Sequence, residues 1–185
     1  NDYYDFFDFK TDKRASEKCD GFKESLSAKN LIFRYPGAGR NALDGVNFTV
    51  HKGEKIAVVG ENGCGKTTLT KLLMGLYAPT GGEVDMDGKN ICDFDGSYYE
   101  NFSLVAQKFG RYSLTFGENI AFSRFGELGD RARIESAAKS VGIDKLAVDI
   151  GGLDTELGVE FGGKELSGGQ WQKVALARGI FRDAD

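Results

Sequence analysis

Hydrophobic and polar residues alternate along three stretches in the first half of the chain, the pattern of strands with one buried face. We predict strands at Leu26–Tyr35 and Gly45–Val50, joined by a turn at Pro36–Gly39. A third strand is predicted at Glu83–Gly88, after the turn Pro79–Gly82. Strands of this kind are typical of an antiparallel sheet that is exposed on one side.

Two mainly apolar runs predict further strands. Lys55–Val59 is expected to be a short buried strand, and Phe102–Ala106 a further strand with Gln107 at its C-terminal end. Between them, leucines recur at the spacing of one helical face, which predicts a helix after the first run. The leucines of this face are Leu69, Leu72, Leu73 and Leu76.

After Thr115 the pattern changes to that of helices. We expect one or two helical turns at Glu118–Phe122, and then a helix that Asp130 caps and Gly142 ends. Its apolar face would consist of Ile134, Ala137, Ala138 and Val141. Gly151–Glu165 is expected to be a glycine-rich loop, and a last helix is expected to start near Gly169. Its buried side would carry Val174, Ala177, Ile180 and Phe181. The fold class is therefore α/β, with a mainly helical part at about 115–182.

A phosphate-binding motif lies between the first apolar run and the leucine-bearing helix. The segment fits G-x-x-x-x-G-K-[ST], the P-loop or Walker A motif. It reads Gly60, Glu61, Asn62, Gly63, Cys64, Gly65, Lys66, Thr67 and Thr68. The glycines let backbone N–H groups surround phosphate oxygens at a helix N-terminus. Lys66 would reach the β- and γ-phosphates and the Thr67 hydroxyl would hold Mg²⁺, so the chain is predicted to bind a nucleoside triphosphate.

Composition narrows the possible partners and the compartment. The 185 residues carry a net charge of −4, which gives no support to nucleic acid as a partner. Three cysteines without metal-ligand spacing favour a reducing cytosolic setting. The one histidine, His51, is expected to be a surface turn residue. No apolar run approaches the ~20 residues of a membrane span.

A second anion-binding element is predicted at Leu166–Gln170, which reads Leu-Ser-Gly-Gly-Gln just before the last helix. A serine and two glycines at a helix start offer a hydroxyl, free N–H groups and the positive end of the helix dipole. Alone, this pattern is more often a plain N-cap. With a P-loop 101 residues before Ser167, measured from Lys66, the phosphate-binding interpretation is favoured.

With these two motifs in this order, the chain resembles the ATP-binding cassette (ABC) family, whose signature is LSGGQ. The resemblance runs from about residue 27 to the end and implies a P-loop NTPase core with an antiparallel β subdomain and a helical signature subdomain. Tyr35, 25 residues before Gly60, is similar to the aromatic residue that stacks on adenine. Gln107 is similar to the Q-loop glutamine, which meets Mg²⁺ and faces the membrane domain.

Other stretches are similar to those of ABC exporters. They are Leu114–Ile120, Asp154–Thr155 and Leu166–Arg178, and the combination of 162–165 with 170–173 is similar to bacterial peptide and lantibiotic exporters. By the same resemblance, residues 1–24 would be a linker from a preceding transmembrane domain and 25–185 a partial ATP-binding domain. The alternative for the aromatic residues at 3–9 is that they cover the domain that follows.

The resemblance also implies a mechanism that needs two copies of the domain. One copy would hold ATP with its P-loop, and Ser167, Gly168, Gly169 and Gln170 of a second copy, identical or paralogous, would close on the γ-phosphate. The implied cofactors are ATP and Mg²⁺. The implied partner is a transmembrane domain of the same or another chain, at the cytoplasmic face of the cell membrane.

The family's catalytic carboxylate has no counterpart within the chain. The Walker B aspartate, the glutamate that polarises water and the switch histidine are expected after Asp185, so this segment is predicted to be an inactive ATPase when alone. Asp183 and Asp185 do not follow an apolar strand and are not candidates. The loop at 158–163 departs from the exporter pattern, and Glu160 is the candidate for its cross-domain glutamate.

Two other functions remain as alternatives. One is a non-transport ABC ATPase of chromosome or DNA-repair type, but the residues between the two motifs lack the sustained heptads of a long coiled coil. The other is a module that senses nucleotide without turnover.

Overall fold

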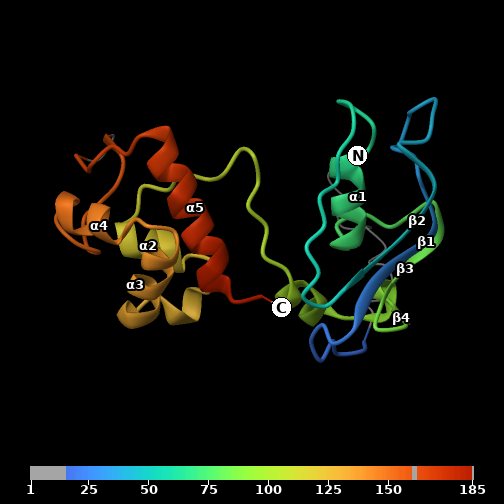
Figure 1. The fold of residues 1–185 in the computed structure, drawn as a ribbon, viewed down its shortest axis with the longest axis horizontal. Helices are drawn as coiled ribbons and strands as arrows, with labels where there is room; N and C mark the ends of the chain where they lie inside the picture. The colour runs from blue at the N-terminus through green and yellow to red at the C-terminus, as the bar shows by residue number, and fades with distance from the viewer. Residues whose placement is uncertain (1–15, 160–161, 185) are drawn as a thin grey trace, which may run out of the picture. The chain divides into compact units, whose positions relative to one another are not determined.

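The computed structural model describes residues 16–159 and 162–184, which form two compact units. The sheet unit ends at Phe102, and the helical unit runs from Ser103 to Ala184 (Figure 1). Among the described residues, no helix combines the length and the apolar character that a membrane crossing requires.

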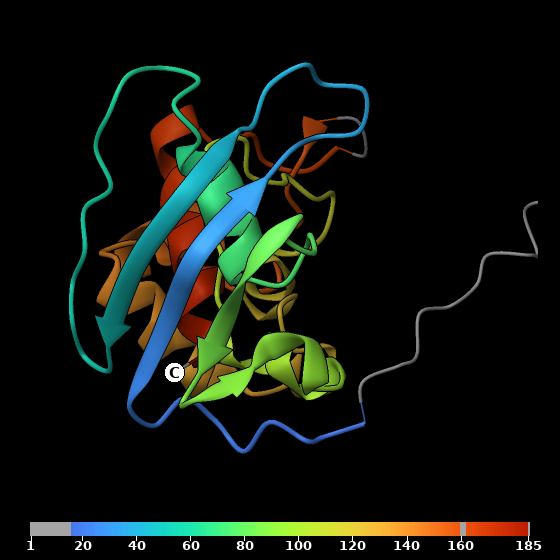
Figure 2. The same ribbon diagram turned by 90° about the vertical axis from the view of Figure 1, so that its right-hand side faces the viewer.

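The sheet unit contains a four-stranded antiparallel sheet. Its strands are β1 (Ser25–Phe33), β2 (Leu43–His51), β3 (Gly81–Met86) and β4 (Lys89–Asn90), in the order β2-β1-β3-β4 (Figure 2). The three alternating stretches thus form strands as predicted, with bounds that differ by a few residues. His51 is exposed as predicted, but it is the last residue of β2 and not a turn residue.

Helix α1 (Lys66–Leu73) packs against the sheet through a common core. Leu72 is fully buried with residues of three strands. The strand residues of this core are Leu26, Ala28, Leu31, Phe33, Leu43, Val84 and Met86. Leu69 and Leu73 are partly buried beside them, but Leu76 lies beyond the end of the helix and is 49% exposed. The prediction that Leu76 belongs to the helical face is therefore wrong, because the helix ends before the stripe is complete.

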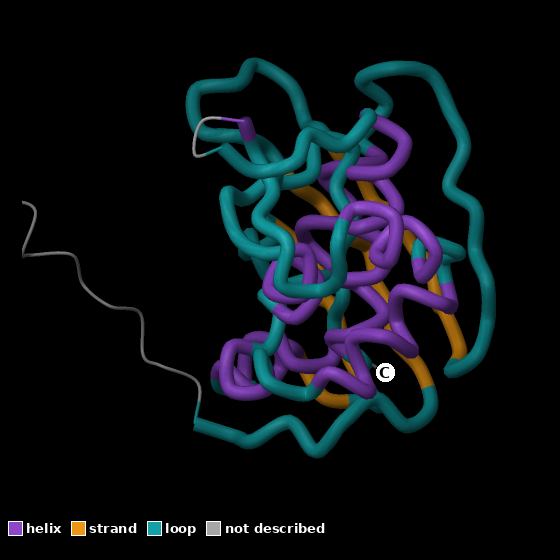
Figure 3. Tube along the Cα trace, turned by 90° about the vertical axis from the view of Figure 1, so that its left-hand side faces the viewer, coloured by secondary structure: helices purple, strands orange, loops and turns teal. Residues whose placement is uncertain are grey.

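The run Lys55–Val59, predicted to be a buried strand, is a loop in the structure. It belongs to the long connection between β2 and α1, which Figure 2 shows running outside the sheet and Figure 3 draws as loop. Val59 is 86% exposed and Val58 51%. The prediction is wrong because an apolar run becomes a strand only beside a hydrogen-bonding neighbour, and the described sheet consists of β1 to β4 alone.

The segment before β1 packs on the sheet unit. Cys19 is buried with Met86 in the core, and its N–H donates to Ser97 Oγ at 2.7 Å. The backbone N–H groups of Lys23, Glu24 and Ser25 donate to the Asp87 carboxylate at 2.8, 2.7 and 2.9 Å. The predicted linker 1–24 is therefore attached to this unit at residues 19–24, whereas the aromatic residues at 3–9 lie outside the described residues.

Two short 3-10 helices complete the sheet unit, η1 (Ile91–Asp93) and η2 (Gly96–Asn101). Tyr98 in η2 is buried, and its hydroxyl donates to the carbonyl oxygen of Leu73 at 2.5 Å. This bond ties the end of α1 to the segment that follows the sheet.

The helical unit contains α2 (Phe116–Ala121), η3 (Phe125–Glu127), α3 (Arg131–Ser140), α4 (Asp144–Ile150) and α5 (Gly168–Arg182) (Figure 3). Its core gathers one face of each α-helix around α5. The largest fully buried members are Phe116, Ile120, Ile143, Leu157, Trp171, Val174 and Phe181. Asp130 caps α3 by accepting from the N–H of Arg133 at 3.1 Å, as predicted.

Two sequence predictions differ from the structure, and one helix of this unit has no predicted counterpart. Phe102–Ala106 is not a strand, again because no strand lies beside it in the described residues. Ile180 is 47% exposed, although the other three residues predicted on the buried side of α5 are buried. Helix α4 was not predicted, because it has only seven residues and begins two residues after Gly142, where the preceding helix was expected to end.

Candidate functional site

The P-loop residues form a glycine-rich turn that leads directly into α1. Gly65 is the N-cap residue in the left-handed conformation, with φ at +99°. A Cβ on Gly65 would lie 2.6 Å from the carbonyl oxygen of Ala42, so both the conformation and the space require glycine. Gly63 also has a left-handed φ of +82°. The loop therefore has the backbone that glycines were predicted to provide.

Lys66 folds back over this loop. Its ammonium group donates to the carbonyl oxygens of Gly60 and Glu61 at 2.8 and 2.7 Å, and lies 3.7 Å from Cys64 Sγ. The positive charge thus lies on the loop at the N-terminal end of α1, where the helix dipole adds to it. This is the electrostatic setting of an anion site.

Thr67 and Thr68 begin α1 but differ in their surroundings. The Thr67 side chain is exposed, whereas Thr68 is only 6% exposed. The Thr68 hydroxyl lies 3.1 Å from the Tyr35 hydroxyl. Thr67 is thus accessible to a ligand, and Thr68 connects the P-loop helix to the residue that follows β1.

Tyr35 belongs to a cluster of three aromatic rings in the sheet unit. Its ring meets Phe33 edge-on at a centroid distance of 4.9 Å and Tyr77 at 5.8 Å. Phe33 and Tyr77 are stacked at 5.4 Å, and Lys71 Nζ lies 5.3 Å from the Tyr77 ring. Tyr35 is therefore held in place by two rings and one hydroxyl contact. The structure brings Tyr35 and the P-loop helix together, and the stacking of Tyr35 on adenine stays a prediction.

In the helical unit, Ser167 is the N-cap residue of α5. Ser167 Oγ accepts from the N–H of Gln170 at 3.3 Å, and the N–H of Ser167 donates to Gln170 Oε1 at 2.8 Å. This reciprocal pair is a capping box. Gln170 is therefore occupied with the helix start, a role that the sequence analysis did not assign to it.

Two buried residues flank the exposed Ser167, Gly168 and Gly169. Leu166 is 3% exposed and Trp171 is 2% exposed, and both belong to the core of the helical unit. Apolar residues on either side of an N-cap fix the angle at which the chain enters the helix. The signature residues are thereby presented to solvent on a rigid support.

Gln107 is exposed in a loop of the helical unit. Thr67 belongs to the sheet unit, so joint contact of these two residues with Mg²⁺ stays a prediction. Glu160 and Asp185 lie outside the described residues. Asp183 is the C-cap residue of α5, with a left-handed φ of +51°.

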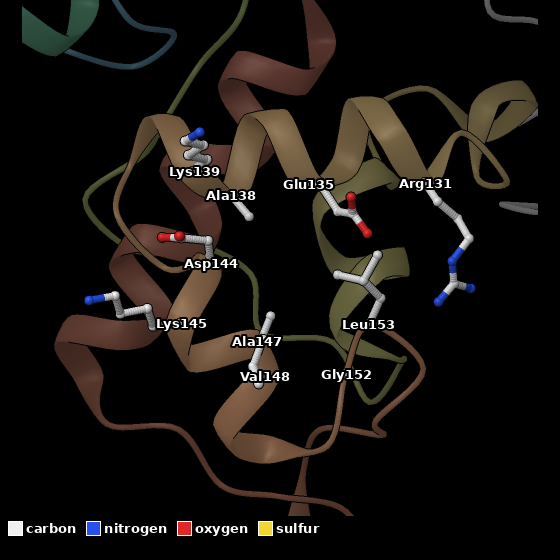
Figure 4. Close-up of a pocket in the computed structure, with 10 residues that line it drawn as sticks. All are labelled: Arg131, Glu135, Ala138, Lys139, Asp144, Lys145, Ala147, Val148, Gly152 and Leu153. Carbon is white, nitrogen blue, oxygen red and sulfur yellow. The ribbon is translucent and has the colours of Figure 1, made fainter.

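A cavity of about 460 Å³ lies between α3 and α4 and contains none of the predicted ATP-binding residues. Figure 4 shows Glu135 of α3 and Leu153 facing one another on one side of it, and Asp144 and Lys145 of α4 on the other. Arg131 at its edge forms two 2.9 Å bonds with Asp154. The charges around the cavity are mixed, so it lacks the concentrated positive charge of a phosphate site. Among the described residues, no group of three or more His, Cys, Asp or Glu side chains could hold a metal ion.

A family model described as "ABC transporter" matches residues 43–185, which include the P-loop, Gln107 and the signature. The chain belongs to the ABC transporter family. The prediction drawn from the two motifs is thereby confirmed, together with the fold class.

Three similar proteins carry names that refer to transport or export. It is 38% identical to the subtilin transport ATP-binding protein SpaT of Bacillus subtilis, over 100% of the chain and 31% of that protein. It is 38% identical to the nisin transport ATP-binding protein NisT of Lactococcus lactis, over 91% of the chain and 29% of that protein. A bacterial Atm1-family ABC exporter with ATP bound superposes with a TM-score of 0.86 at 30% identity, over 99% of the chain and 32% of the exporter. The chain thus spans about a third of the length of these relatives.

Proposed function

We propose that this chain is the ATP-binding part of an ABC exporter, in which ATP binding and hydrolysis between two such domains power transport across a membrane. The observation that carries the proposal is the P-loop geometry: left-handed glycines lead into α1, with the Lys66 ammonium on the loop. The names of similar proteins, two transport ATP-binding proteins and one ABC exporter, support the same function.

In the sheet unit, the loop N–H groups and Lys66 would bind the phosphates, and Tyr35 would stack on the adenine base. Thr67 supplies an exposed hydroxyl at the first turn of α1, a hard oxygen ligand of the kind that Mg²⁺ prefers. Mg²⁺ usually keeps several waters and binds through substrate phosphates and few protein groups, so one hydroxyl fits its needs. Gln107 is proposed as the second protein contact. Bound Mg²⁺ would neutralise the phosphate charge that develops during phosphoryl transfer.

In the helical unit, the exposed Ser167, Gly168 and Gly169 would contact the γ-phosphate bound by a second copy. Their support by Leu166 and Trp171 suits a role in which position matters more than adaptability. The partner domain would be identical or paralogous. A transmembrane domain at the cytoplasmic face of the cell membrane would couple to the pair.

The P-loop, Tyr35 and the signature are proposed to bind ATP, and none of them is proposed to orient the attacking water molecule. A turnover measurement on the full-length protein also separates an exporter ATPase from a module that only senses nucleotide.

The decisive experiment measures ATP binding and turnover by the full-length protein and by its Lys66→Ala variant. Loss of the ammonium should weaken ATP binding about tenfold or more, as charge-assisted hydrogen bonds are worth about 1.5–3 kcal/mol. Lys139→Ala, which removes an exposed cation from α3, is the matched control and should bind ATP normally. Equal ATP affinity in wild type and Lys66→Ala would contradict the assignment of the P-loop.

A further inference from the structure

The loop that carries Gln107 is bonded at both ends to adjacent residues of α5. Before Gln107, Ser103 Oγ donates to the carbonyl oxygen of Gly179 at 2.9 Å. After it, Arg178 Nη1 donates to the carbonyl oxygen of Gly110 at 3.2 Å. Both bonds end on the same turn of the helix that starts after Ser167.

Arg178 makes further contacts that fix its orientation. Its Nε donates to the carbonyl oxygen of Asn119 at 2.8 Å, and Nη2 donates to Asn119 Oδ1 at 3.4 Å. The guanidinium also lies 4.8 Å from the centre of the Tyr112 ring. Burial lowers the pKa of the Arg178 guanidinium, and Tyr112 opposes this shift. A planar fork of donors can serve several acceptors and an aromatic face together, which a lysine cannot do.

Asn119 extends this network along the chain. Its side chain is fully buried, and the two hydrogens on Nδ2 are shared among the carbonyl oxygens of Tyr112, Leu114 and Thr115, at N···O distances of 3.0, 3.2 and 3.1 Å. The carbonyl groups of 110, 112, 114 and 115 are thus all bonded to Arg178 or Asn119. The backbone that follows the Gln107 loop is therefore held by two side chains that contact each other.

Gly179 permits the close approach on the other side of the loop. A Cβ at Gly179 would lie 3.1 Å from Val105 Cγ2 and 3.2 Å from Ser103 Oγ, tighter than ordinary contact. Glycine inside a helix is less favourable than alanine. The absence of a side chain at Gly179 therefore leaves room for the side chains of Ser103 and Val105.

Between these two attachments the loop is not packed solidly on the helix. A cavity of about 220 Å³ is lined by 103–106 and 108–110 together with Ala175, Arg178 and Arg182. The loop is therefore held at its ends, and the exposed Gln107 lies in the span between them.

We propose that Arg178 and Gly179 are positioning residues. They make the Gln107 loop (103–110) follow the movement of α5, the signature helix that begins after Ser167. Since α5 is a continuous helix from Gly168 to Arg182, displacement at Ser167 is transmitted along it to the two loop attachments. Contact of the signature with a partner's nucleotide would then shift Gln107. This inference rests on the proposed function, because it assigns the coupling between two elements of the same ATP site.

The test compares Arg178→Lys, Gly179→Ala and the control Lys173→Gln in the full-length protein. Lys173 is exposed on the same helix, so its variant removes a cation without touching the loop attachments. Arg178→Lys and Gly179→Ala should lower kcat about tenfold or more, because small misplacements of catalytic groups have large effects on rate. The KM for ATP should stay within about twofold, since the binding residues in the sheet unit are unchanged.

Gly179→Ala separates positioning from stability. Alanine favours the helix, so an effect of helix stability alone would leave or raise activity, whereas displacement of Ser103 and Val105 should lower it. Hydrogen exchange supplies a second readout: amides at 108–115 should exchange faster in Arg178→Lys while those of α3 and α4 stay unchanged.

Two outcomes would overturn the inference. One is wild-type kcat in both variants, and the other is faster exchange throughout the helical unit, which would make Arg178 a purely structural residue. Failure of the proposed function would give a different result, because the wild-type protein itself would then neither bind nor hydrolyse ATP. The exchange pattern at 108–115 can be measured in either case.

Discussion

The hydroxyl groups of Tyr35 and Thr68 lie 3.1 Å apart, which joins the residue after β1 to the first turn of the P-loop helix. Tyr35 is thereby linked to the phosphate-binding loop without belonging to it. Its ring is also held edge-on by Phe33 and Tyr77. A ring fixed in this manner loses little conformational entropy when it stacks on a base.

The first prediction separates the Tyr35 ring from its hydroxyl. Base–aromatic stacking is worth roughly 1–3 kcal/mol, so Tyr35→Ala should weaken ATP binding about tenfold or more. Tyr35→Trp should be tolerated, and Tyr35→Phe should keep most of the affinity because only the bond to Thr68 is lost. Calorimetric titration of the folded variants with ATP gives these affinities. An alanine variant that binds as tightly as wild type would exclude the stacking role.

The second prediction concerns the three cysteines, which differ in exposure and surroundings. Cys64 is exposed on the P-loop, and Lys66 Nζ lies 3.7 Å from its sulfur. Cys19 is buried, and burial together with the Asp93 charge raises the pKa of the Cys92 thiol. At neutral pH a maleimide should therefore label Cys64 first.

Saturating ATP should protect Cys64 and leave the labelling of Cys92 unchanged. Peptide mass mapping after a timed reaction distinguishes the two sites, and Cys64→Ala identifies the protected fraction. If ATP failed to slow the labelling of Cys64, the nucleotide would not occupy this loop.

The third prediction separates the capping role of Ser167 from its proposed contact with a partner's nucleotide. Aspartate is as good an N-cap residue as serine, so Ser167→Asp should keep α5 stable. Its negative charge would face the γ-phosphate, and ATP-dependent pairing of two domains should be lost while ATP binding to one domain persists. Ser167→Ala, by contrast, should cost about 1 kcal/mol of helix stability.

Cross-linking between two full-length copies, with and without ATP, measures the pairing. Ser136→Asp on the exposed side of α3 is the charge-matched control and should pair normally. Loss of ATP binding by a single domain in Ser167→Asp would contradict an action on the partner's nucleotide.

The fourth prediction concerns Asp87 and pH. Burial alone would raise the pKa of this carboxyl group, but hydrogen bonds from the N–H groups of Ser25, Lys23 and Glu24 outweigh it and lower the pKa. The stabilisation is therefore complete above the unfolded-state pKa of about 3.9, and it is lost as the pH falls through the lower folded-state value. At neutral pH the three bonds should be fully formed.

Asp87→Ala should cost about 1.5–3 kcal/mol at neutral pH, as expected for hydrogen bonds to a charged group. Asp87→Asn should cost less, because asparagine tolerates the left-handed φ of +53° and still offers one acceptor. Protease sensitivity of residues 16–24 reports the loss, and Asp20→Asn in the same segment is the control. Wild-type protease resistance in Asp87→Ala would show that these bonds do not hold the segment.

Local signals in the sequence predicted the elements whose partners are close along the chain. Asp130 and Ser167 cap their helices, and β1 pairs with β2 through the expected turn. Lys55–Val59 and Phe102–Ala106 were predicted to be strands from apolar content alone, and both are loops. Whether an apolar run pairs depends on a neighbouring strand, which its own sequence does not encode.

The residues of the candidate site also divide into those that the sequence predicts and those that depend on distant neighbours. The motif residues of the P-loop and signature could be found because the chemistry of phosphate binding demands them at fixed spacing. The contacts of Arg178 with Gly110 and Asn119 could not, since they join segments 68 and 59 residues apart through backbone carbonyl groups. Every residue has a backbone carbonyl group, so a contact with one does not require a particular residue type and leaves no pattern in the sequence.

Trp171, which directly follows the signature and is buried, is the one tryptophan of the 185 residues. Its indole ring is 2% exposed in the core of the helical unit, four positions after Ser167. In this chain, intrinsic tryptophan fluorescence therefore reports on the helical unit alone, and the sheet unit is silent at the same wavelengths. A red shift of the emission would mark the moment when water reaches the base of the signature helix.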